Sequence, residues 1–354
     1  MNGQSNQLTG GIAVGHDGRV HTTFGHNPSS GRLCSFDPNM QNIPRGGSGF
    51  RRYAKDFFCA PSGSTFWARD FSGIEAVLVG YFAGANRYVR LAKRDVHSFY
   101  TAHAICALDP VRFNANDLPS IDWPDDRLFA RLAEIKGEFK EDRNNLYKHL
   151  VHGANFLQTP DGAAKKIFKD TGIAYPVPTV RRVMGTYFEL FPEIRVWHRQ
   201  LCNQVDGDKK REANDDNPAE LGVCYVRNPF GYVHRFYNVL DWEKIDGKWY
   251  STFGEDAKRL VSFLPQSTAA AIIKSAARRI YYDHPCVGET LRLLIHDEIF
   301  GECSDGGVEE CLRISGEVME SPHLELPLDP AWGMGSHLSI GTEAKVGRVW
   351  SEMH

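Results

Sequence analysis

The chain has 354 residues, of which 42% are hydrophobic and 24% are charged, a composition typical of a folded globular protein. No run approaches the ~20 consecutive apolar residues of a membrane-spanning helix, and the polar, glycine-rich residues 1–11 do not resemble a secretory signal. The net charge of −3 does not by itself indicate a nucleic-acid binder, but DNA binding requires positive charge only where the phosphates lie.

The eight cysteines show no metal-binding spacing. None form a C-x-x-C pair, and the closest two, Cys303 and Cys311, have no histidine partner at the spacing of a zinc site. We therefore expect reduced thiols and no structural zinc.

The first clear elements are a strand followed by a helix. Residues 64–70 (S-T-F-W-A-R-D) predict a strand ending on Asp70, and residues 72–83 carry apolar side chains at a helical period. Ser72 is the expected N-cap of this helix, with Glu75 as its capping-box partner. Asp70 therefore lies at a junction that faces solvent or a ligand.

The middle of the chain alternates loops and helices. Residues 109–125 are rich in proline, asparagine and aspartate, which predicts a long loop, and a helical stretch follows from about 126 to about 156. Residues 206–218 are polar or small and predict an exposed, mobile connection. Residues 257–280 are small and apolar with few breakers, which predicts a buried helix.

A β-hairpin is predicted near the end of the chain. Residues 291–295 and 299–303 are apolar strands that flank His296, Asp297 and Glu298, so two acids lie at the hairpin tip.

Two hydrophobic strands that each carry an aspartate at one end are what a two-metal phosphoryl-transfer site requires. Magnesium prefers hard oxygen ligands, and two ions ~3.5–4 Å apart stabilise the attacking and the leaving oxygens together. A strand-ending aspartate is nevertheless most often a cap or turn residue, and two acids at a hairpin tip also form an ordinary turn. Local chemistry leaves both interpretations open.

Longer motifs around these acids are more specific. Five segments resemble, in order, those of family A DNA polymerases, the group of bacterial DNA polymerase I and many phage replicases. They are residues 31–45 (G-R-L-C-S-F-D-P-N-M-Q-N-I-P-R), 70–75 (D-F-S-G-I-E), 94–97 (R-D-V-H), 264–274 (L-P-Q-S-T-A-A-A-I-I-K) and 295–298 (I-H-D-E). The resemblance extends from about residue 17 to the C-terminus and is of the phage type.

The resemblance implies an α+β fold: a polymerase palm, with an antiparallel sheet and packed helices, and a mainly helical fingers subdomain. The implied domains are a flexible lead-in at 1–16, palm at 17–94, fingers at 95–230 and palm again at 231–354. No thumb or exonuclease domain is expected in this chain. A truncated piece, half of a split polymerase and a minimal polymerase all remain open, and we favour a split or partial enzyme.

The resemblance also assigns roles near the acids. Asp70 and Asp297, with the backbone carbonyl of Phe71, would bind two Mg²⁺ ions. Glu298 would support them in catalysis, and Glu75 would exclude a ribose 2′-hydroxyl.

A second group of residues matches family positions that touch the primer–template. Their side chains suit minor-groove acceptors and phosphates, so they would check the shape of a base pair and not its sequence. These residues are Arg32, Gln41, Asn42, Gln266 and His296. Hydrogen bonding to the loop backbone is the alternative interpretation for Gln41 and Asn42.

The nucleotide-binding helix, expected at residues 143–159, departs from the family pattern. Lys148, His152 and Phe156 are spaced by four and therefore share one face. The resemblance implies that these three residues bind the dNTP together with His97, Arg143 and Glu75. The family arginine expected four residues before Lys148 is missing, because Asn144 occupies that position. Either a helix irregularity brings Arg143 into line or another basic residue replaces it.

Three substitutions near the end of this helix affect the sugar site. His152 replaces a phenylalanine or tyrosine, and Leu157 replaces a glycine, which stiffens the helix end. Phe156 replaces a tyrosine whose phenol would bond Glu75. These changes predict weaker sugar discrimination or a different partner for Glu75.

The implied activity is template-directed transfer of a dNTP to a primer 3′-hydroxyl in a bacterial or phage-infected cytoplasm. Primer–template DNA and dNTP are the expected partners, a separate thumb or exonuclease subunit is a candidate partner, and no membrane partner is expected. The alternatives are a single-subunit RNA polymerase, which Glu75 disfavours, and a catalytically weak DNA-binding assembly subunit. Retention of Asp70, Asp297, Lys148 and Glu75 disfavours the second alternative.

Overall fold

The computed structural model describes residues 12–27, 29–44, 49–212 and 223–353. The chain divides into two compact units. Unit 1 comprises Met1–Phe71, Ala270–Ser321 and Thr342–His354, and unit 2 comprises Ser72–Ala269 and Pro322–Gly341. The subdomain boundaries inferred from the sequence stay a prediction.

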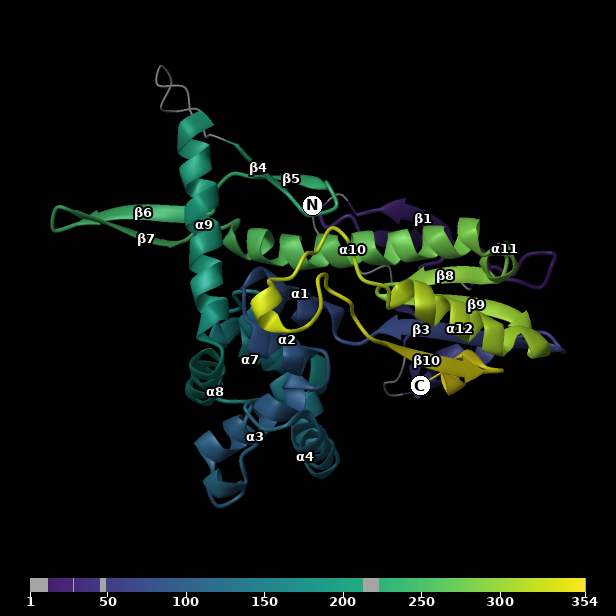
Figure 1. The fold of residues 1–354 in the computed structure, drawn as a ribbon, viewed down its shortest axis with the longest axis horizontal. Helices are drawn as coiled ribbons and strands as arrows, with labels where there is room; N and C mark the ends of the chain where they lie inside the picture. Colours follow the sequence, from purple (N-terminus) through teal and green to yellow (C-terminus); the bar gives the residue numbers. More distant parts are fainter. Residues whose placement is uncertain (1–11, 28, 45–48, 213–222, 354) are drawn as a thin grey trace. The chain divides into compact units, whose positions relative to one another are not determined.

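Unit 1 is built on an antiparallel four-stranded sheet with the order β10-β3-β9-β8 (Figure 1). A two-stranded ribbon, β1–β2, and short helices complete it. The strands are β1 (Thr23–His26), β2 (Leu33–Phe36), β3 (Ser64–Phe71), β8 (Leu291–Ile295), β9 (Glu298–Ser304) and β10 (Thr342–Gly347). The helices are η1 (Met40–Asn42), η2 (Gly49–Phe57), α11 (Pro285–Gly288), η5 (Asp305–Gly307), α12 (Val308–Met319) and η7 (Trp350–Glu352).

The two faces of β3 differ in what they pack against. Trp67 is fully buried on one face, where a Cβ on Gly301 of β9 would come within 2.3 Å of the indole. On the same face Arg69 donates a hydrogen bond to the carbonyl oxygen of Leu312 in α12 at 2.7 Å. The close approach of Trp67 therefore requires glycine at 301.

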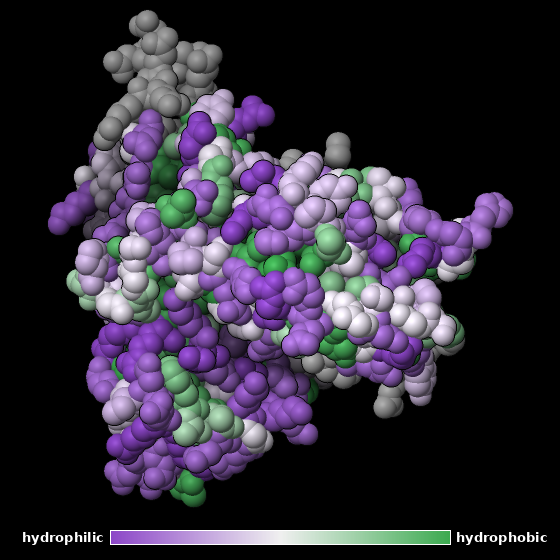
Figure 2. Space-filling model, turned by 45° about the vertical axis from the view of Figure 1, so that its right-hand side comes forward, coloured by the Kyte–Doolittle hydropathy of each residue, from purple (hydrophilic) through white to green (hydrophobic). Residues whose placement is uncertain are grey.

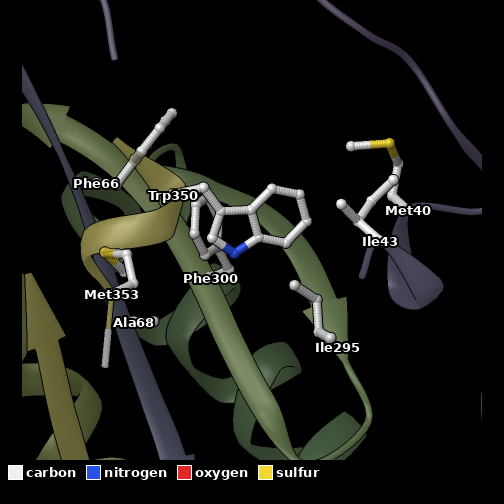
Figure 3. Packing of buried hydrophobic residues seen from close by; sticks show 8 residues of the cluster. All are labelled: Met40, Ile43, Phe66, Ala68, Ile295, Phe300, Trp350 and Met353. Carbon is white, nitrogen blue, oxygen red and sulfur yellow. The ribbon is translucent and has the colours of Figure 1, made fainter. Parts of the chain in front are cut away.

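The opposite face of the sheet carries a hydrophobic cluster around Trp350. Phe66 and Ala68 of β3 lie on this face with Phe300 of β9, whose ring centroid is 5.3 Å from that of Trp350 (Figure 3). The cluster consists of Met40, Ile43, Phe66, Ala68, Ile295, Phe300, Trp350 and Met353. Because side chains alternate along a strand, this apolar face continues to Asp70 and Glu298.

Unit 2 is mainly helical and has two β-hairpins, one of which, β6–β7, packs against α9 (Figure 1). Its first helices are α1 (Ile74–Phe82), α2 (Asn86–Ala92), α3 (Val96–Leu108), η3 (Ala115–Asp117), α4 (Asp125–Glu138), α5 (Lys140–Asp142) and η4 (Arg143–Tyr147). The chain continues through α6 (Lys148–Asn155), α7 (Pro160–Thr171), α8 (Val177–Leu190), α9 (Pro192–Glu212) and η6 (Pro330–Trp332). The strands are β4 (Cys224–Arg227), β5 (Val233–Phe236), β6 (Leu240–Ile245) and β7 (Lys248–Phe253). Helix α10 (Ala257–Asp283) contributes to both units.

Most predicted elements are confirmed. The strand at 64–70, the hairpin at 291–303 and the helices at 126–156 and 257–280 are present, and the loop at 109–125 contains one short turn of 3-10 helix. Two expectations are wrong. The N-cap of α1 is Gly73, at φ +63°, and not Ser72. Helix α9 continues to Glu212, so residues 206–212 are not a loop, and residues 213–218 of the expected connection lie outside the described part.

In the described part of the chain, no helix is both long and apolar enough to cross a membrane. Figure 2 shows a face on which hydrophilic residues predominate and hydrophobic residues form separate small groups.

Leu157, just after α6, has φ 52°, in the left-handed region that glycine adopts without strain. A bulky residue there is an outlier that costs about 1–2 kcal/mol. The helix end thus keeps the backbone of a glycine while carrying a leucine.

We expect Leu157→Gly to be more stable than Leu157→Ala by about 1 kcal/mol, since both remove the same side chain and only glycine relieves the strain. Urea unfolding of the two variants measures this difference. The control is Ala133→Gly at an exposed site within α4, where glycine should be the less stable residue by about 1 kcal/mol. Equal or lower stability of Leu157→Gly would contradict the assigned backbone strain.

Candidate active site

The β3–β9 pairing brings the predicted acids of unit 1 together. Asp70 lies directly opposite Glu298 in the ladder, and the backbone N–H of Phe71 donates to the carbonyl oxygen of Asp297 at 3.1 Å. The hairpin turn between β8 and β9 has two residues, and its first residue, His296, has φ 56°. Asp297 is thereby fixed beside the end of β3.

Two cations lie among these carboxylates. The ammonium of Lys345, from β10, is 2.7 Å from Glu298 Oε2 and 3.2 Å from Asp70 Oδ2. Arg32 is 3.7 Å from Asp297 Oδ1. Burial lowers the pKa of Lys345, but the hydrogen bonds and charges of Glu298 and Asp70 outweigh it, so the pKa is raised above its usual value.

The sequence analysis did not identify Lys345. A lysine in a short strand has the same local pattern whether it points to solvent or to a carboxylate. Lys345 reaches the acids because β10 pairs with β3, and this pairing cannot be inferred from residue spacing.

The donor set fits magnesium. The side chains of Asp70 and Asp297 are 33% and 21% exposed, whereas that of Glu298 is only 5% exposed. The described residues include no group of three or more His, Cys, Asp or Glu side chains that would hold a metal unaided. Magnesium keeps several waters and is commonly bound by one or two carboxylates plus substrate phosphates, so two partly exposed aspartates on rigid strands suit it.

Four of the residues predicted to touch the primer–template lie in unit 1, and Gln266 lies in unit 2. The side chain of Gln41 accepts from the Ser35 N–H at 3.1 Å and donates to the carbonyl oxygen of Leu294 at 2.8 Å. This is the loop-backbone bonding of the alternative interpretation. Asn42 and His296 are exposed, and a DNA contact for each of the five stays a prediction.

The predicted nucleotide-binding helix of unit 2 contains the irregularity that the sequence left open. Residues Arg143–Tyr147 form a π-helical turn, in which the N–H of Lys148 bonds to the carbonyl oxygen of Arg143 five residues back. The hydrogen bond therefore spans five residues instead of the four of an α-helix, so the turn holds more residues than an α-helical one. This is the kind of helix irregularity that would bring Arg143 towards the line of Lys148 and His152, and the role of Arg143 stays a prediction.

Arg143 is held by the start of α3. Its Nη2 is 2.9 Å from Asp95 Oδ1, and its Nε donates to Ser98 Oγ at 3.1 Å. Asp95 is also the N-cap of α3 and accepts from the Ser98 N–H at 3.0 Å. Burial raises the pKa of Asp95, but Arg143 and Ser98 together outweigh it and lower that pKa. The sequence analysis assigned no role to either partner, although Asp-x-x-Ser ahead of a helix is an N-cap signal.

Positive side chains gather around His97. Burial and the charge of Arg143 lower the pKa of His97 to about 3, the charge of Asp95 opposes them, and Lys148 and His152 lower the pKa more weakly. Among the described residues no atom accepts from or donates to its buried Nδ1. The charge of Arg143 is already paired with Asp95, so Lys148 and His152, both exposed, are the basic groups most open to an anion here.

Glu75 has a histidine as its neighbour. His152 Nδ1 is 3.7 Å from Glu75 Oε2, and the His152 ring contacts Phe156 edge-on, with ring centroids 4.8 Å apart. The sequence predicted either weaker sugar discrimination or a different partner for Glu75, and His152 is the candidate for that partner.

A buried polar network anchors α6. The OH groups of Tyr88 and Tyr187 reach Asn155 Oδ1 at 3.3 and 2.5 Å, and His198 Nε2 lies 2.9 Å from the Asn155 carbonyl oxygen. Because buried polar groups are costly to leave unpaired, the network ties the end of α6 to α2, α8 and α9.

The family model for DNA polymerase family A matches residues 6–116. DNA polymerase I of Mycobacterium bovis is 34% identical over 330 residues, which are 91% of this chain and 30% of that protein. The thermostable DNA polymerase I of Thermus caldophilus is 26% identical over 324 residues, 90% of this chain and 32% of that protein. The chain thus spans about a third of the length of these curated relatives.

A solved structure described as the POL domain of Pol1 from M. smegmatis, in complex with DNA primer-template and dNTP, has a similar fold. The TM-score is 0.62 at 22% identity, covering 96% of this chain and 49% of that chain. The mixed helix-and-sheet polymerase fold expected from the sequence is thereby confirmed. The ordered motifs, the match to the family model over residues 6–116, the named relatives and the fold together support a family A DNA polymerase.

Proposed function

We propose that the chain catalyses template-directed DNA synthesis, transferring a dNTP to a primer 3′-hydroxyl. The observation that carries this proposal is the meeting of Asp70 and Asp297 at the end of the β3–β9 ladder. The named relatives are DNA polymerases, and the solved neighbour holds primer-template and dNTP, which supports the same substrates here.

The acids of unit 1 would act on the reacting oxygens. Two Mg²⁺ ions, bound by Asp70, Asp297 and the Phe71 carbonyl, would supply charge stabilisation to the attacking and leaving oxygens. Asp70 and Asp297 hold their carboxylates on paired strands, so little reorganisation is needed on binding. Arg32, beside Asp297, would meet the growing primer end.

The basic residues of unit 2 would bind the nucleotide. Lys148 and Arg143, on either side of the π turn, would neutralise the triphosphate and the departing pyrophosphate, with His97 within the influence of both charges. Phe156 is only 4% exposed and contacts the His152 ring, so it would support His152 from behind, and stacking near the templating base stays a prediction. Glu75, with His152 beside it, would lie under the sugar and exclude a 2′-hydroxyl.

Several narrower inferences from the sequence also stay predictions. Binding of two ions, the phage type, a separate thumb or exonuclease subunit and a cytoplasmic location stay predictions. Retention of the acids and of the basic line argues against a purely structural DNA-binding subunit, which would need neither.

We expect Asp70→Asn and Asp297→Asn each to lower the rate of primer extension with Mg²⁺ by about a thousandfold or more, because both remove a charge that acts at the transition state. Gel-based single-turnover extension measures the rate. The control is Glu309→Gln, an exposed carboxylate on α12, which should extend like wild type. If Asp297→Asn extends a primer as fast as wild type, the proposed metal centre is wrong.

We expect Arg143→Ala to raise the KM for dNTP by about ten- to a hundredfold, the effect of losing a charge-assisted hydrogen bond. Steady-state extension at varied dNTP gives this value, and Arg181→Ala, exposed on α8, is the control. An unchanged KM for Arg143→Ala, with a raised KM for Lys166→Ala or Lys169→Ala, would assign the triphosphate to another basic residue.

We expect wild type to prefer dNTP over NTP, and Glu75→Ala to reduce that preference by about tenfold or more, because the side chain that crowds the 2′-hydroxyl is gone. His152→Phe should reduce it less, since Glu75 remains but loses its neighbour. Single-turnover incorporation of both nucleotides tests this. Full discrimination in Glu75→Ala would remove Glu75 from the sugar site, and an NTP preference in wild type would favour the RNA polymerase alternative.

A further inference from the structure

Lys345 occupies an unusual place for a lysine. It lies opposite Ala68 in the β10–β3 ladder, on the sheet face that carries Phe66 and Phe300, and its side chain is only 9% exposed. Its ammonium crosses in front of Asp70, the diagonal neighbour on β3, to reach Glu298 on β9. Ordering a long side chain on an apolar face is costly, so the contacts at its end must compensate.

The two contacts of this ammonium are unequal. The Glu298 carboxylate is 5% exposed and lies at 2.7 Å, whereas the Asp70 carboxylate is 33% exposed and lies at 3.2 Å. A buried carboxylate without a counter-charge is strongly unfavourable, so Glu298 depends on Lys345. Asp70 has water as an alternative partner and does not depend on it to the same degree.

Three acids therefore meet at the end of this sheet, and one of them is already neutralised by the protein. We propose that Lys345 is a positioning residue that keeps Glu298 out of the metal's donor set and leaves Asp70 and Asp297 as the side-chain ligands. This inference rests on the proposed metal centre. It explains why an acid next to Asp297 can support the site without being a third ligand.

The proposal predicts what happens when the ammonium is removed. In Lys345→Met the Glu298 carboxylate loses its counter-charge, and a bound cation becomes its best replacement. The local charge of Asp70, Asp297, Glu298 and Lys345 is −2 in wild type and −3 in Lys345→Met. In the double variant Lys345→Met/Glu298→Gln it is −2 again, so the double variant matches wild type in charge and lacks the extra acid.

The test measures metal binding in the absence of DNA and nucleotide. Mn²⁺ titration followed by electron paramagnetic resonance gives the affinity, and Tb³⁺ luminescence lifetimes in H₂O and D₂O give the number of bound waters. We expect Lys345→Met to bind Mn²⁺ about tenfold more tightly than wild type, with about one water fewer on Tb³⁺, because Glu298 enters the coordination shell. Wild-type values are expected for the double variant, for Lys345→Arg and for the exposed control Lys248→Met on β7.

Several outcomes would overturn the proposal. Unchanged or weaker Mn²⁺ binding by Lys345→Met shows that the lysine does not withhold a ligand. Tighter binding with an unchanged water count shows that it acts through charge alone. If wild type binds no Mn²⁺ that depends on Asp70 and Asp297, the metal centre itself is wrong, and the inference fails with it.

Folding is checked separately by thermal unfolding with and without Mn²⁺. We expect Lys345→Met to be destabilised without metal and to gain more from Mn²⁺ than wild type does, since only the variant has an uncompensated Glu298. If Lys345→Met does not fold even with Mn²⁺, Lys345→Arg and the double variant still decide: a changed water count in either one contradicts the proposal.

Discussion

The register between β3 and β9 is the constraint on which the candidate metal site depends. It sets Asp70 opposite Glu298, and the next backbone contact, from Phe71 to Asp297, brings in the hairpin tip. A slip of one residue would turn Asp70 to the face of Trp67 and α12, where Gly301 leaves room only for an indole. The packing of Trp67 against Gly301 thus also protects the geometry of the acids.

Charge organises the two units in different ways. At the paired ends of β3 and β9 in unit 1, three carboxylates are partly offset by Lys345 and Arg32. In unit 2, basic groups gather around His97, and Asp95 restrains one of them, Arg143. The proposed nucleotidyl transfer would need both a cation site and an anion site.

Much of this arrangement could be predicted from local sequence. The strand before Asp70 and the hairpin around Asp297 follow from alternation and turn residues, and the resemblance implies the roles proposed for these acids. The pairing of strands that are distant in sequence could not be predicted, because nothing near Lys345 indicates that β10 lies beside β3. Local patterns also gave two wrong element boundaries. Gly73 is the N-cap of α1 in place of Ser72, and the polar residues 206–212 are helical as part of α9.

The π turn before Lys148 has a consequence for how such proteins are recognised. A helix can absorb one inserted residue at the cost of a single irregular turn, and the π turn here lies where the proposed basic residues Arg143 and Lys148 are five residues apart instead of four. A pattern written with fixed intervals treats the same insertion as a broken motif, and the match to the family model ends at residue 116, before this helix begins. Divergent members of a family can therefore be closer in three dimensions than their aligned letters suggest, most of all at helices where function depends on a face and not on a count.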